Sequence, residues 1–305
     1  MPMYVGIDIG GTKMLLVAYE HLANGDSLEA LEPIQAIQAT MPTGPQFDSR
    51  TAEAAIARFI AQLPAAPCTI GIAVPGLVTT GHAEAGDRVL SCDALLGLDS
   101  WTPAKQFARE TCQVTVLNDI EAALTAEKIH FAPHSQAAVV MVGTAVGAAF
   151  LVNGQLMRGA QGWAGELGYL PVVLSDGRRG RLDEAAGGSF IAATLGLDGA
   201  GLAQAAQAGN ERVLEAIAQG GESFGLGLAA VINLFNPLYL SIGGGTWNLP
   251  GYRAAALHSA QRFALPDLWA GCNIRDVKAG KQVVALGAAI AANNQRYKEI
   301  CEESL

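Results

Sequence analysis

The feature that most constrains this chain is a strand–turn–strand pattern that occurs twice. Residues Tyr4–Glu20 read YVGIDIGGTKMLLVAYE, in which two apolar runs flank a short polar segment containing two glycines. Residues 137–154, AAVVMVGTAVGAAFLVNG, repeat this arrangement in the second half of the chain. Apolar runs of this length, bounded by glycines, are typical of buried strands joined in a hairpin. The pattern therefore indicates a weak internal duplication with one glycine turn in each half.

Strand and helix patterns alternate along the rest of the chain. Such alternation predicts an α/β protein whose sheets are covered by helices on both faces, with a boundary between two halves after Leu117. Further strands are expected within Cys68–Val78, where the strand ends in a Pro-Gly turn at Pro75-Gly76, and over Gln113–Asp119 and Leu238–Gly245. Helices are expected over Thr51–Leu63, Ile120–Phe131, Arg212–Phe235 and Ala285–Lys298.

Composition excludes several classes of protein. With 305 residues the chain is long enough for two domains, and a net charge of −9 without a dense basic cluster argues against a nucleic-acid partner. Five cysteines without short pairings favour a reducing compartment. The longest apolar stretch, Leu226–Ile242, contains Asn233, Asn236 and Pro237, so no membrane span is expected. Because the first strand begins immediately, no signal peptide is expected either, and a soluble cytoplasmic protein is predicted.

Three segments end a predicted strand with glycines: Asp8–Lys13 (DIGGTK), Val142–Gly147 (VGTAVG) and Ile242–Thr246 (IGGGT). Because glycine lacks a Cβ, the backbone can approach a ligand closely, and successive N–H groups can converge on phosphate oxygens. Thr12 and Thr144 would each add a hydroxyl donor. The alternative is that these turns only join strands, and neither a P-loop nor a Rossmann fingerprint is present.

An aspartate, Asp8, precedes the first turn. It cannot itself favour phosphate, because like charges repel. We expect Asp8 to hold Mg²⁺, directly or through water, between its carboxylate and a phosphate.

Two further carboxylates allow two interpretations each. Asn118-Asp119 ends a strand and begins a helix, where Asp119 could either cap the helix or act as the general base for a substrate hydroxyl. Phosphoryl transfer requires mainly alignment and charge neutralisation, and one carboxylate near the attacking oxygen suits it. Glu166, flanked by Gly165 and Gly168, is either a solvated loop residue or a ligand for a polyhydroxyl compound.

Taken in order, these motifs resemble the ROK family of sugar kinases, within the larger actin-like/hexokinase superfamily. The resemblance implies ATP-dependent phosphorylation of a hexose or an N-acyl hexosamine, with Mg²⁺. It also implies an actin-like ATPase (ribonuclease H-like) fold of two domains, residues 1–117 with about 286–305 and residues 118–285, which bind the sugar in the cleft between them. A homodimer is the family tendency. The matching motifs are GIDIGGTK, VPGLV, LNDIEAA, VGTAVG, GAQGWAGELGYLPV and INLFNPLYLSIGGG, with VVALGAAIAA near the end of the chain.

The resemblance also implies a role for individual residues. Asp119 would be the catalytic base that deprotonates a sugar hydroxyl. We expect this to be the hydroxyl on C6. The first phosphate loop would comprise Asp8, Gly10, Gly11, Thr12 and Lys13, the second would comprise Gly143, Thr144 and Gly147, and Gly243, Gly244 and Gly245 would lie near the adenosine. The substrate would be bound by Gly76, Asp93, Asn118, Asp119, Glu166, Tyr169 and Asp183.

This chain departs from the family at its zinc motif. Relatives commonly have GExGH followed by CxCGxxGCxE, in which one histidine and three cysteines bind a structural zinc. Here the histidine position is Tyr169, and the cysteine positions fall on Leu174, Asp176 and Arg181. All four ligands are replaced together, so zinc is not expected.

Other departures concern the sugar and the second turn. The glutamate that closes the motif is Asp183, and the asparagine that usually binds sugar in the first half aligns loosely with Asp93. Ala145 replaces a glycine in the second turn and requires a negative φ there. These changes leave the sugar unidentified, with glucose, fructose, mannose, allose, N-acetylglucosamine and N-acetylmannosamine all possible.

Two hypotheses compete with the kinase. Some ROK relatives are sugar-sensing repressors with an N-terminal helix-turn-helix, but this chain starts directly on the strand before DIGGTK and is acidic. A catalytically silent sugar-binding module is the other alternative, because the zinc motif and part of the sugar set have changed. Retention of Asp8, Asn118, Asp119 and Glu166 argues against it.

Overall fold

The computed structural model describes residues 3–20, 33–79, 87–174 and 176–302, and the chain divides into two compact units. The N-terminal unit comprises Met1–His130 and Lys278–Leu305, and the central unit comprises Phe131–Val277. The first division therefore falls after His130 instead of after Leu117, because helix α3 (Asp119–Lys128) packs on helix α10 (Val283–Glu302) of the N-terminal unit.

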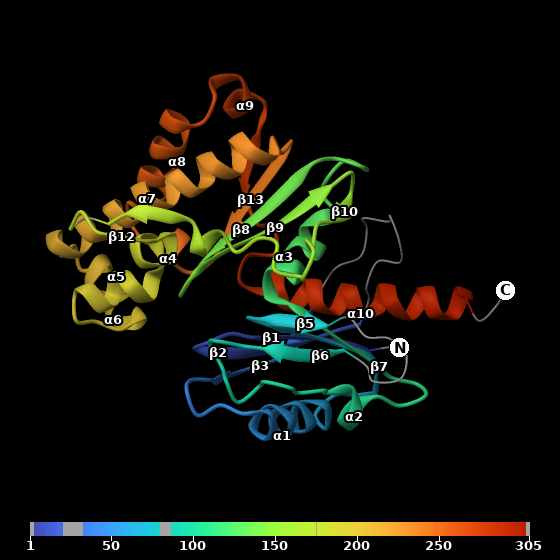
Figure 1. Ribbon diagram of the computed structural model, residues 1–305. Coiled ribbons are helices and arrows are strands. Elements are labelled where there is room, and N and C mark those ends of the chain that lie inside the picture. The colour runs from blue at the N-terminus through green and yellow to red at the C-terminus, as the bar shows by residue number, and fades with distance from the viewer. Residues whose placement is uncertain (1–2, 21–32, 80–86, 175, 303–305) are drawn as a thin grey trace. The chain divides into compact units, whose positions relative to one another are not determined.

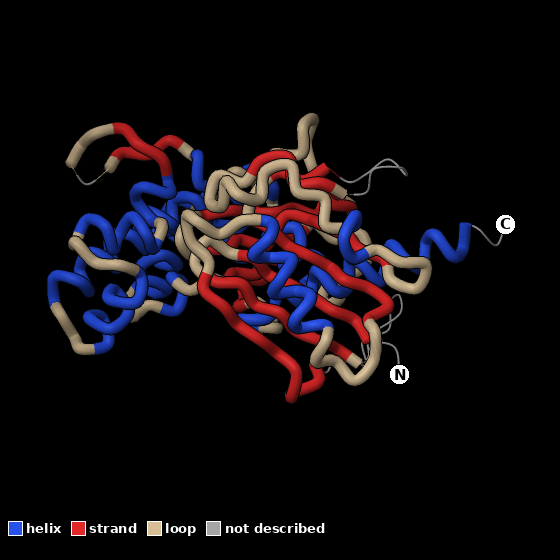
Figure 2. Tube along the Cα trace, turned by 90° about the horizontal axis from the view of Figure 1, so that it is seen from below, coloured by secondary structure: helices blue, strands red, loops and turns tan. Residues whose placement is uncertain are grey.

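A five-stranded mixed sheet, in the order β3-β2-β1-β4-β7, forms the middle of the N-terminal unit. Strands β1, β4 and β7 are parallel, whereas β2 is antiparallel to both of its neighbours, β1 and β3. Helices α1 and α2 lie on one side of this sheet, and α3 and α10 lie on the other (Figure 1). In Figure 2, which views the molecule from the side of α1, helices cross in front of the strands. The bounds are β1 Met3–Ile9, β2 Lys13–Tyr19, β3 Pro33–Pro42, β4 Pro67–Val74, β7 Gln113–Asn118, α1 Ser49–Ile60 and α2 Ala104–Phe107, and a small antiparallel pair is made by β5 Leu77–Thr79 and β6 Arg88–Ser91.

The two faces of this sheet are packed in different ways. Alternate residues of β1, among them Val5 and Ile7, are fully buried in a hydrophobic core that they share with Ile56 and Phe59 of α1. On the opposite face, Gly6 lets α10 lie against the strand, because a Cβ there would be 1.9 Å from the Ala285 carbonyl oxygen. Burial on both faces explains why these strands read as continuous apolar runs.

Helices α3 and α10 approach each other closely at Gly287. A Cβ at this position would lie 1.7 Å from the carbonyl oxygen of Ala122, so no larger residue fits without displacing a backbone. Gly287 thus permits the close packing of α3 on α10, the helix that belongs with it to the N-terminal unit.

The central unit is built on a second five-stranded mixed sheet, in the order β10-β9-β8-β13-β14. Strands β8, β13 and β14 are parallel, and β8–β9–β10 form antiparallel hairpins. The strands are β8 Ala137–Val142, β9 Val146–Val152, β10 Gln155–Leu156, β13 Tyr239–Gly243 and β14 Asn273–Asp276, with a separate hairpin of β11 Pro171–Val173 and β12 Arg179–Arg181. The helices are α4 Leu182–Ala186, α5 Gly188–Thr194, α6 Gly199–Gln207, α7 Glu211–Phe235, α8 Tyr252–Phe263 and α9 Pro266–Gly271, and 3-10 turns occur at Leu167–Tyr169 and Thr246–Asn248. A further 3-10 turn, Gly280–Gln282, belongs to the N-terminal unit and precedes α10.

Helix α7 covers one face of the central sheet and shares a hydrophobic core with it. Val140 and Phe150 of the sheet are buried together with Phe224 and Leu228 of the helix. The ring of Phe150 stacks on that of Phe235 at a centroid distance of 4.0 Å. Burial of several aromatic side chains stabilises this layer and fixes the position of the strands that end at the second and third glycine turns.

The predicted elements are present, and the predicted α/β class with mixed sheets is confirmed. Strands β3, β10 and β14, the two small hairpins and helices α2, α4, α5, α6, α8 and α9 were not predicted. The described cysteines, Cys68, Cys92, Cys112 and Cys272, are unpaired, and Cys301 lies in a stretch whose side chains are not described. Among the described residues no helix is both long enough and apolar enough to cross a membrane.

Candidate functional site

The first glycine turn joins β1 to β2 in the N-terminal unit. The N–H of Gly10 donates to the Lys13 carbonyl oxygen at 2.8 Å and closes the turn. Thr43, just after β3, supports the turn with two hydrogen bonds. The Thr43 hydroxyl donates to the Gly10 carbonyl oxygen at 2.6 Å, and the Thr43 N–H donates to the Thr12 carbonyl oxygen at 3.1 Å. A hairpin held in this way exposes Thr12 and Lys13.

Asp8, one residue before the end of β1, has an unusual environment. Burial raises the pKa of its carboxyl from 3.8 to about 6, and the charge of nearby Lys13 opposes this rise only in part. A carboxylate that has lost hydration without full compensation gains from a bound cation. The site therefore suits Mg²⁺, which prefers oxygen ligands.

At the junction of β7 and α3, Asn118 is the residue that caps the helix. Its Oδ1 accepts from the N–H groups of Ile120 and Glu121 at 2.8 and 3.2 Å, and its Nδ2 donates to the Gly76 carbonyl oxygen at 3.1 Å. The capping role considered for Asp119 thus belongs to its neighbour. Asp119 is the first residue of α3 and its Oδ1 accepts from the Ile120 N–H at 2.9 Å, which orients the carboxylate at the start of the helix.

The parallel strands of the N-terminal unit bring these carboxylates to one edge of the sheet. Asp8 is in register with Ala73 of β4, and Ala73 is in register with Leu117 of β7. Parallel strands lie about 4.8 Å apart, so the backbones of Asp8 and Leu117, the residue just before the Asn118-Asp119 pair, are separated by roughly 10 Å across two strand spacings. Both acidic groups therefore lie at the carboxyl ends of parallel strands, the usual location of ligand contacts in open α/β sheets.

Two further predicted residues, Gly76 and Asp93, lie at this edge. A Cβ on Gly76 would be 2.2 Å from the Ser91 carbonyl oxygen, so this glycine allows the segment that carries Asp93 to pass close by. The Ser91 hydroxyl donates to the Asp93 carboxylate at 3.4 Å. Ala94, the next residue, lies 3.6 Å from where a Cβ of Gly11 would be, which connects this segment to the first turn.

The second glycine turn joins β8 to β9 in the central unit. The Gly143 carbonyl oxygen accepts from the Gly188 N–H and from the Thr246 hydroxyl, both at 2.8 Å. The Thr144 carbonyl oxygen accepts from the N–H and the hydroxyl of Ser189 at 3.3 and 2.8 Å. Ala145 does not have a positive φ, so the constraint expected for this alanine is met.

The third glycine run, Gly243–Gly245, lies beside the second turn. Gly244 has φ +106°, and a Cβ there would be 2.0 Å from the Val142 carbonyl oxygen, so the close approach of β13 to β8 requires glycine. Gly245 has open space around it. The residue that follows, Thr246, makes the hydrogen bond to Gly143 described above.

Glu166 lies on a loop that is attached to β9, the strand after the second turn. The N–H of Ala148, on β9, donates to the Gly165 carbonyl oxygen at 2.9 Å. Gly165 has φ +110°, and a Cβ there would be 1.9 Å from the Ala148 carbonyl oxygen, so only glycine permits this approach. Glu166 itself is exposed and precedes the 3-10 turn Leu167–Tyr169.

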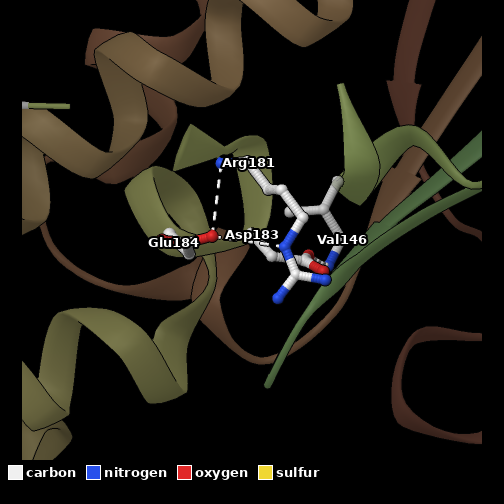
Figure 3. Close-up of polar contacts among 4 residues, drawn as sticks. All are labelled: Val146, Arg181, Asp183 and Glu184. Carbon is white, nitrogen blue, oxygen red and sulfur yellow. Dashed lines mark hydrogen bonds and ion pairs between the residues drawn. The ribbon is translucent and has the colours of Figure 1, made fainter. Parts of the chain in front are cut away.

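Asp183 links the Glu166 loop to the second turn. Its Oδ1 accepts from the N–H of Val146 at 2.7 Å, and burial raises the pKa of its carboxyl. Both carboxylate oxygens lie against Gly168, where a Cβ would be 2.3 and 2.6 Å from them. Figure 3 shows that the neighbouring Glu184 is directed elsewhere, to Arg181. Asp183 therefore has a structural partner where the sequence predicts a sugar ligand.

Non-ligating side chains occupy the positions of the family's zinc motif. The guanidinium of Arg181 lies 4.7 Å from the centroid of the Tyr169 ring, and the Leu174 side chain packs on Gly180 within the β11–β12 hairpin. Asp176 pairs with Arg178 at 2.7 Å near the exposed tip. In the described ranges, no group of three or more histidine, cysteine, aspartate or glutamate side chains is arranged to hold a metal ion. The cation–π contact thus joins the hairpin to Tyr169, and the apolar packing of Leu174 lies within the hairpin itself.

Sequence reasoning missed three side chains that contact the turns, namely Thr43, Ser189 and Thr246. Thr43 is 33 residues from its partner Gly10, and no local pattern marks it. Thr246 directly follows the three glycines and could have been noted there.

Within the N-terminal unit the structure brings together Asp8, Gly11, Gly76, Asp93, Asn118 and Asp119. Within the central unit it brings together the second turn, Gly243–Gly245 and, through Asp183, the loop of Glu166 and Tyr169.

Two curated proteins align with part of the chain. The chain is 26% identical over 212 residues to a xylose repressor from Caldicellulosiruptor bescii, covering 60% of this chain and 51% of that protein. It is 27% identical over 195 residues to an N-acetylmannosamine kinase from Vibrio cholerae, covering 61% and 62%. Both alignments cover less than two thirds of the relative's own length.

The fold is shared with solved structures over nearly its full length. A ROK family glucokinase from Streptomyces griseus, in complex with glucose and AMPPNP, superposes with a TM-score of 0.76 at 20% identity and covers 95% of this chain and 99% of that one. The predicted actin-like ATPase fold is confirmed by this likeness. A model of the ROK family matches residues 4–295, and the chain therefore belongs to the ROK family.

Proposed function

We propose that this protein is an ATP- and Mg²⁺-dependent sugar kinase of the cytoplasm, which transfers the γ-phosphoryl group of ATP to a hydroxyl, that on C6, of a hexose or N-acyl hexosamine. The observation that carries this proposal is the placement of Asp8 and Asp119 at one edge of the N-terminal sheet, beside a glycine turn. One carboxylate suits the metal and the other suits the substrate hydroxyl.

Asp119 is the general base in this proposal. It takes the proton of the sugar hydroxyl as that oxygen attacks the γ-phosphorus, and ADP leaves with the electron pair of the broken bond. The start of α3 fixes the carboxylate, because its Oδ1 accepts from the Ile120 N–H. The Asn118 side chain donates to the Gly76 carbonyl oxygen at 3.1 Å, and this hydrogen bond ties the backbone next to Asp119 to the segment after β4.

Asp8, which is half-buried near the end of β1, would hold the Mg²⁺ that accompanies ATP, since loss of hydration raises the pKa of its carboxyl. Mg²⁺ supplies neutralisation of the phosphate charge. Lys13, exposed at the end of the same turn, adds a positive charge nearby.

The glycines of the turns support a phosphate ligand. Gly143 and Gly245 have nothing within 4 Å of where a Cβ would be, and neither has a positive φ. Gly11 has ordinary φ and only an ordinary contact at 3.6 Å. Neither packing nor conformation requires glycine at these three positions, and close approach of a ligand to the backbone is the remaining physical reason. Gly243 and Gly244, by contrast, are required by packing.

The substrate side is open to more than one sugar. The residues proposed to contact the sugar are Glu166, Tyr169 and Asp93. The guanidinium of Arg181 lies over the Tyr169 ring and fixes the orientation of that side chain. For Asp183 we propose support of the Glu166 loop, because its carboxylate is already engaged by Val146.

Some relatives in the family are repressors, so a silent sugar-binding role is the second candidate. A panel assay separates the two: ADP release with ATP and Mg²⁺ is measured against hexoses and N-acyl hexosamines. The kinase proposal predicts sugar-dependent ADP release with at least one of them. Sugar binding by calorimetry without ADP release from any sugar would instead establish the silent role.

A further inference from the structure

We infer that Thr43 and Thr246 are positioning residues for the two glycine turns. Each donates its hydroxyl to the carbonyl oxygen of the first glycine of a turn, Gly10 or Gly143, and thereby directs the next N–H of the turn toward a bound anion. The inference rests on the proposed function for the identity of that anion, the phosphate chain of a nucleoside triphosphate.

The central unit shows the arrangement most fully. Four donors fix the two consecutive carbonyl groups of the second turn: the Gly188 N–H and Thr246 hydroxyl at Gly143, and the N–H and hydroxyl of Ser189 at Thr144. All four lie on the side of α5 and Thr246, so both carbonyls point toward this side.

Peptide geometry then determines where the N–H groups point. The structure has no cis peptide bond among its described residues, and in a planar trans peptide the C=O and N–H directions are opposite. With the carbonyls of Gly143 and Thr144 held on one side, the N–H groups of Thr144 and Ala145 face the other. Thr144 and Ala145 are exposed, so these two successive N–H groups form an accessible anion-binding pair.

The N-terminal unit repeats the device with different parts. The Thr43 hydroxyl donates a hydrogen bond to the Gly10 carbonyl oxygen at 2.6 Å, and the Thr43 N–H donates one to the Thr12 carbonyl oxygen at 3.1 Å. By the same geometry the N–H of Gly11 faces away from Thr43. One threonine from a segment distant in sequence therefore supports each turn, in two units that fold around separate sheets.

Thr246 is itself fixed in place. It is only 5% exposed, its β-branched side chain restricts rotation about χ1, and its hydroxyl fits beside Gly188, where a Cβ would be 2.2 Å from Oγ1. Burial and restricted rotation therefore favour the observed orientation of the hydroxyl, toward the Gly143 carbonyl.

The test compares isosteric and conservative variants in each unit. Thr43→Val and Thr246→Val replace the hydroxyl with a methyl group, whereas Thr43→Ser and Thr246→Ser keep it. Loss of one neutral hydrogen bond predicts about five- to tenfold weaker binding of AMPPNP–Mg²⁺ by each valine variant, measured by calorimetry. The KM for sugar and the far-ultraviolet circular dichroism stay unchanged, and the serine variants bind the nucleotide analogue like the wild type.

A second readout does not depend on turnover. The backbone amide resonances of Gly11, Thr144 and Ala145 are followed by NMR while AMPPNP–Mg²⁺ is added. We expect these resonances to shift in the wild type. The shift of the Thr144 amide should be smaller in Thr246→Val, and the shift of the Gly11 amide should be smaller in Thr43→Val. If no sugar elicits ADP release but these shifts occur and depend on the threonines, the kinase proposal fails and the inference stands.

Two results would overturn the inference. One is nucleotide affinity and amide shifts in both valine variants equal to those of the wild type. The other is a wild type whose Gly11, Thr144 and Ala145 amides do not respond to millimolar AMPPNP–Mg²⁺. Should one valine variant fail to fold, the valine variant in the other unit and both serine variants still test the inference through their AMPPNP–Mg²⁺ affinity and amide shifts.

Discussion

The burial of Asp8 predicts that this residue destabilises the protein in the absence of metal. The pKa of its carboxyl rises from 3.8 to about 6 on folding, mainly because burial penalises the charged form. The folded state thus holds the proton more tightly than the unfolded state. This contribution to stability is fully present below pH 3.8 and is lost as the pH rises through about 6.

The magnitude follows from the two pKa values. Each pKa unit corresponds to about 1.4 kcal/mol, so ionised Asp8 costs up to about 3 kcal/mol at neutral pH. Asp8→Asn has nearly the same shape and no charge, and it avoids this cost. We therefore expect the variant to be more stable than the wild type above pH 7, and the difference to shrink toward pH 4.

The assay is urea denaturation of both proteins between pH 4 and pH 8, without Mg²⁺ or nucleotide. Asp48→Asn is the matched control: Asp48 caps α1 and hydrogen bonds from Thr51 lower its pKa, so its charge contributes stability above pH 3.8, and its removal should give no gain in stability as the pH rises toward 8. Saturating Mg²⁺ should stabilise the wild type and Asp48→Asn, but not Asp8→Asn, by about 2.7 kcal/mol at a hundredfold excess over Kd. A stability difference between Asp8→Asn and the wild type that is independent of pH would refute the reasoning.

Two other predictions concern the central unit. Gly143→Ala should fold with unchanged stability, because the position has open space and an ordinary φ, yet bind AMPPNP–Mg²⁺ at least about tenfold more weakly. Gly244→Ala should instead lower the thermal midpoint markedly, because φ is +106° and a Cβ would be 2.0 Å from the Val142 carbonyl oxygen. Equal effects of the two substitutions on stability would contradict the account. Asp183→Ala should lose about 1–3 kcal/mol in urea denaturation because it leaves the buried Val146 N–H without an acceptor, whereas Asp183→Asn keeps an acceptor oxygen and most of the stability; an alanine variant as stable as the wild type would show that the hydrogen bond is dispensable.

The part of the fold that sequence predicts well is the part with continuous apolar runs. Strands β1, β4 and β8 are buried on both faces, so their composition alone indicates strand, and the residues at their carboxyl ends follow as site candidates. Strand β3 was missed because it lies at the edge of its sheet and pairs only with β2, so its sequence, PIQAIQATMP, lacks such a run.

The site could be predicted as a set of segments but not as a set of contacts. Asn118 and Asp119 were both candidates, yet only three-dimensional geometry shows that Asn118 provides the cap, since either side chain could do so by type. The carboxylate of Asp183 was assigned to the sugar because of its place in a motif, whereas its nearest partner is a backbone N–H 37 residues away. Contacts of this range have no local signature in the sequence.

The domain boundary illustrates the same limit. Helix α3 follows the strand that ends the predicted first domain, and nothing in its own sequence says which sheet it covers. It packs on α10, more than a hundred residues later, where Gly287 permits an approach of the Ala122 carbonyl that a Cβ would prevent.

The measurement that tests the central claim most directly is the sugar-dependent release of ADP by the wild type and by Asp119→Asn. Glu121→Gln, two residues further along α3, serves as a matched control for loss of a carboxylate. With the best sugar of the panel, we expect Asp119→Asn to lower kcat by about 10²- to 10⁴-fold while AMPPNP–Mg²⁺ affinity stays within about twofold, and Glu121→Gln to remain close to the wild type. Near-wild-type turnover by Asp119→Asn would contradict the assignment of the base, and the absence of sugar-dependent ADP release from the wild type would contradict the kinase itself.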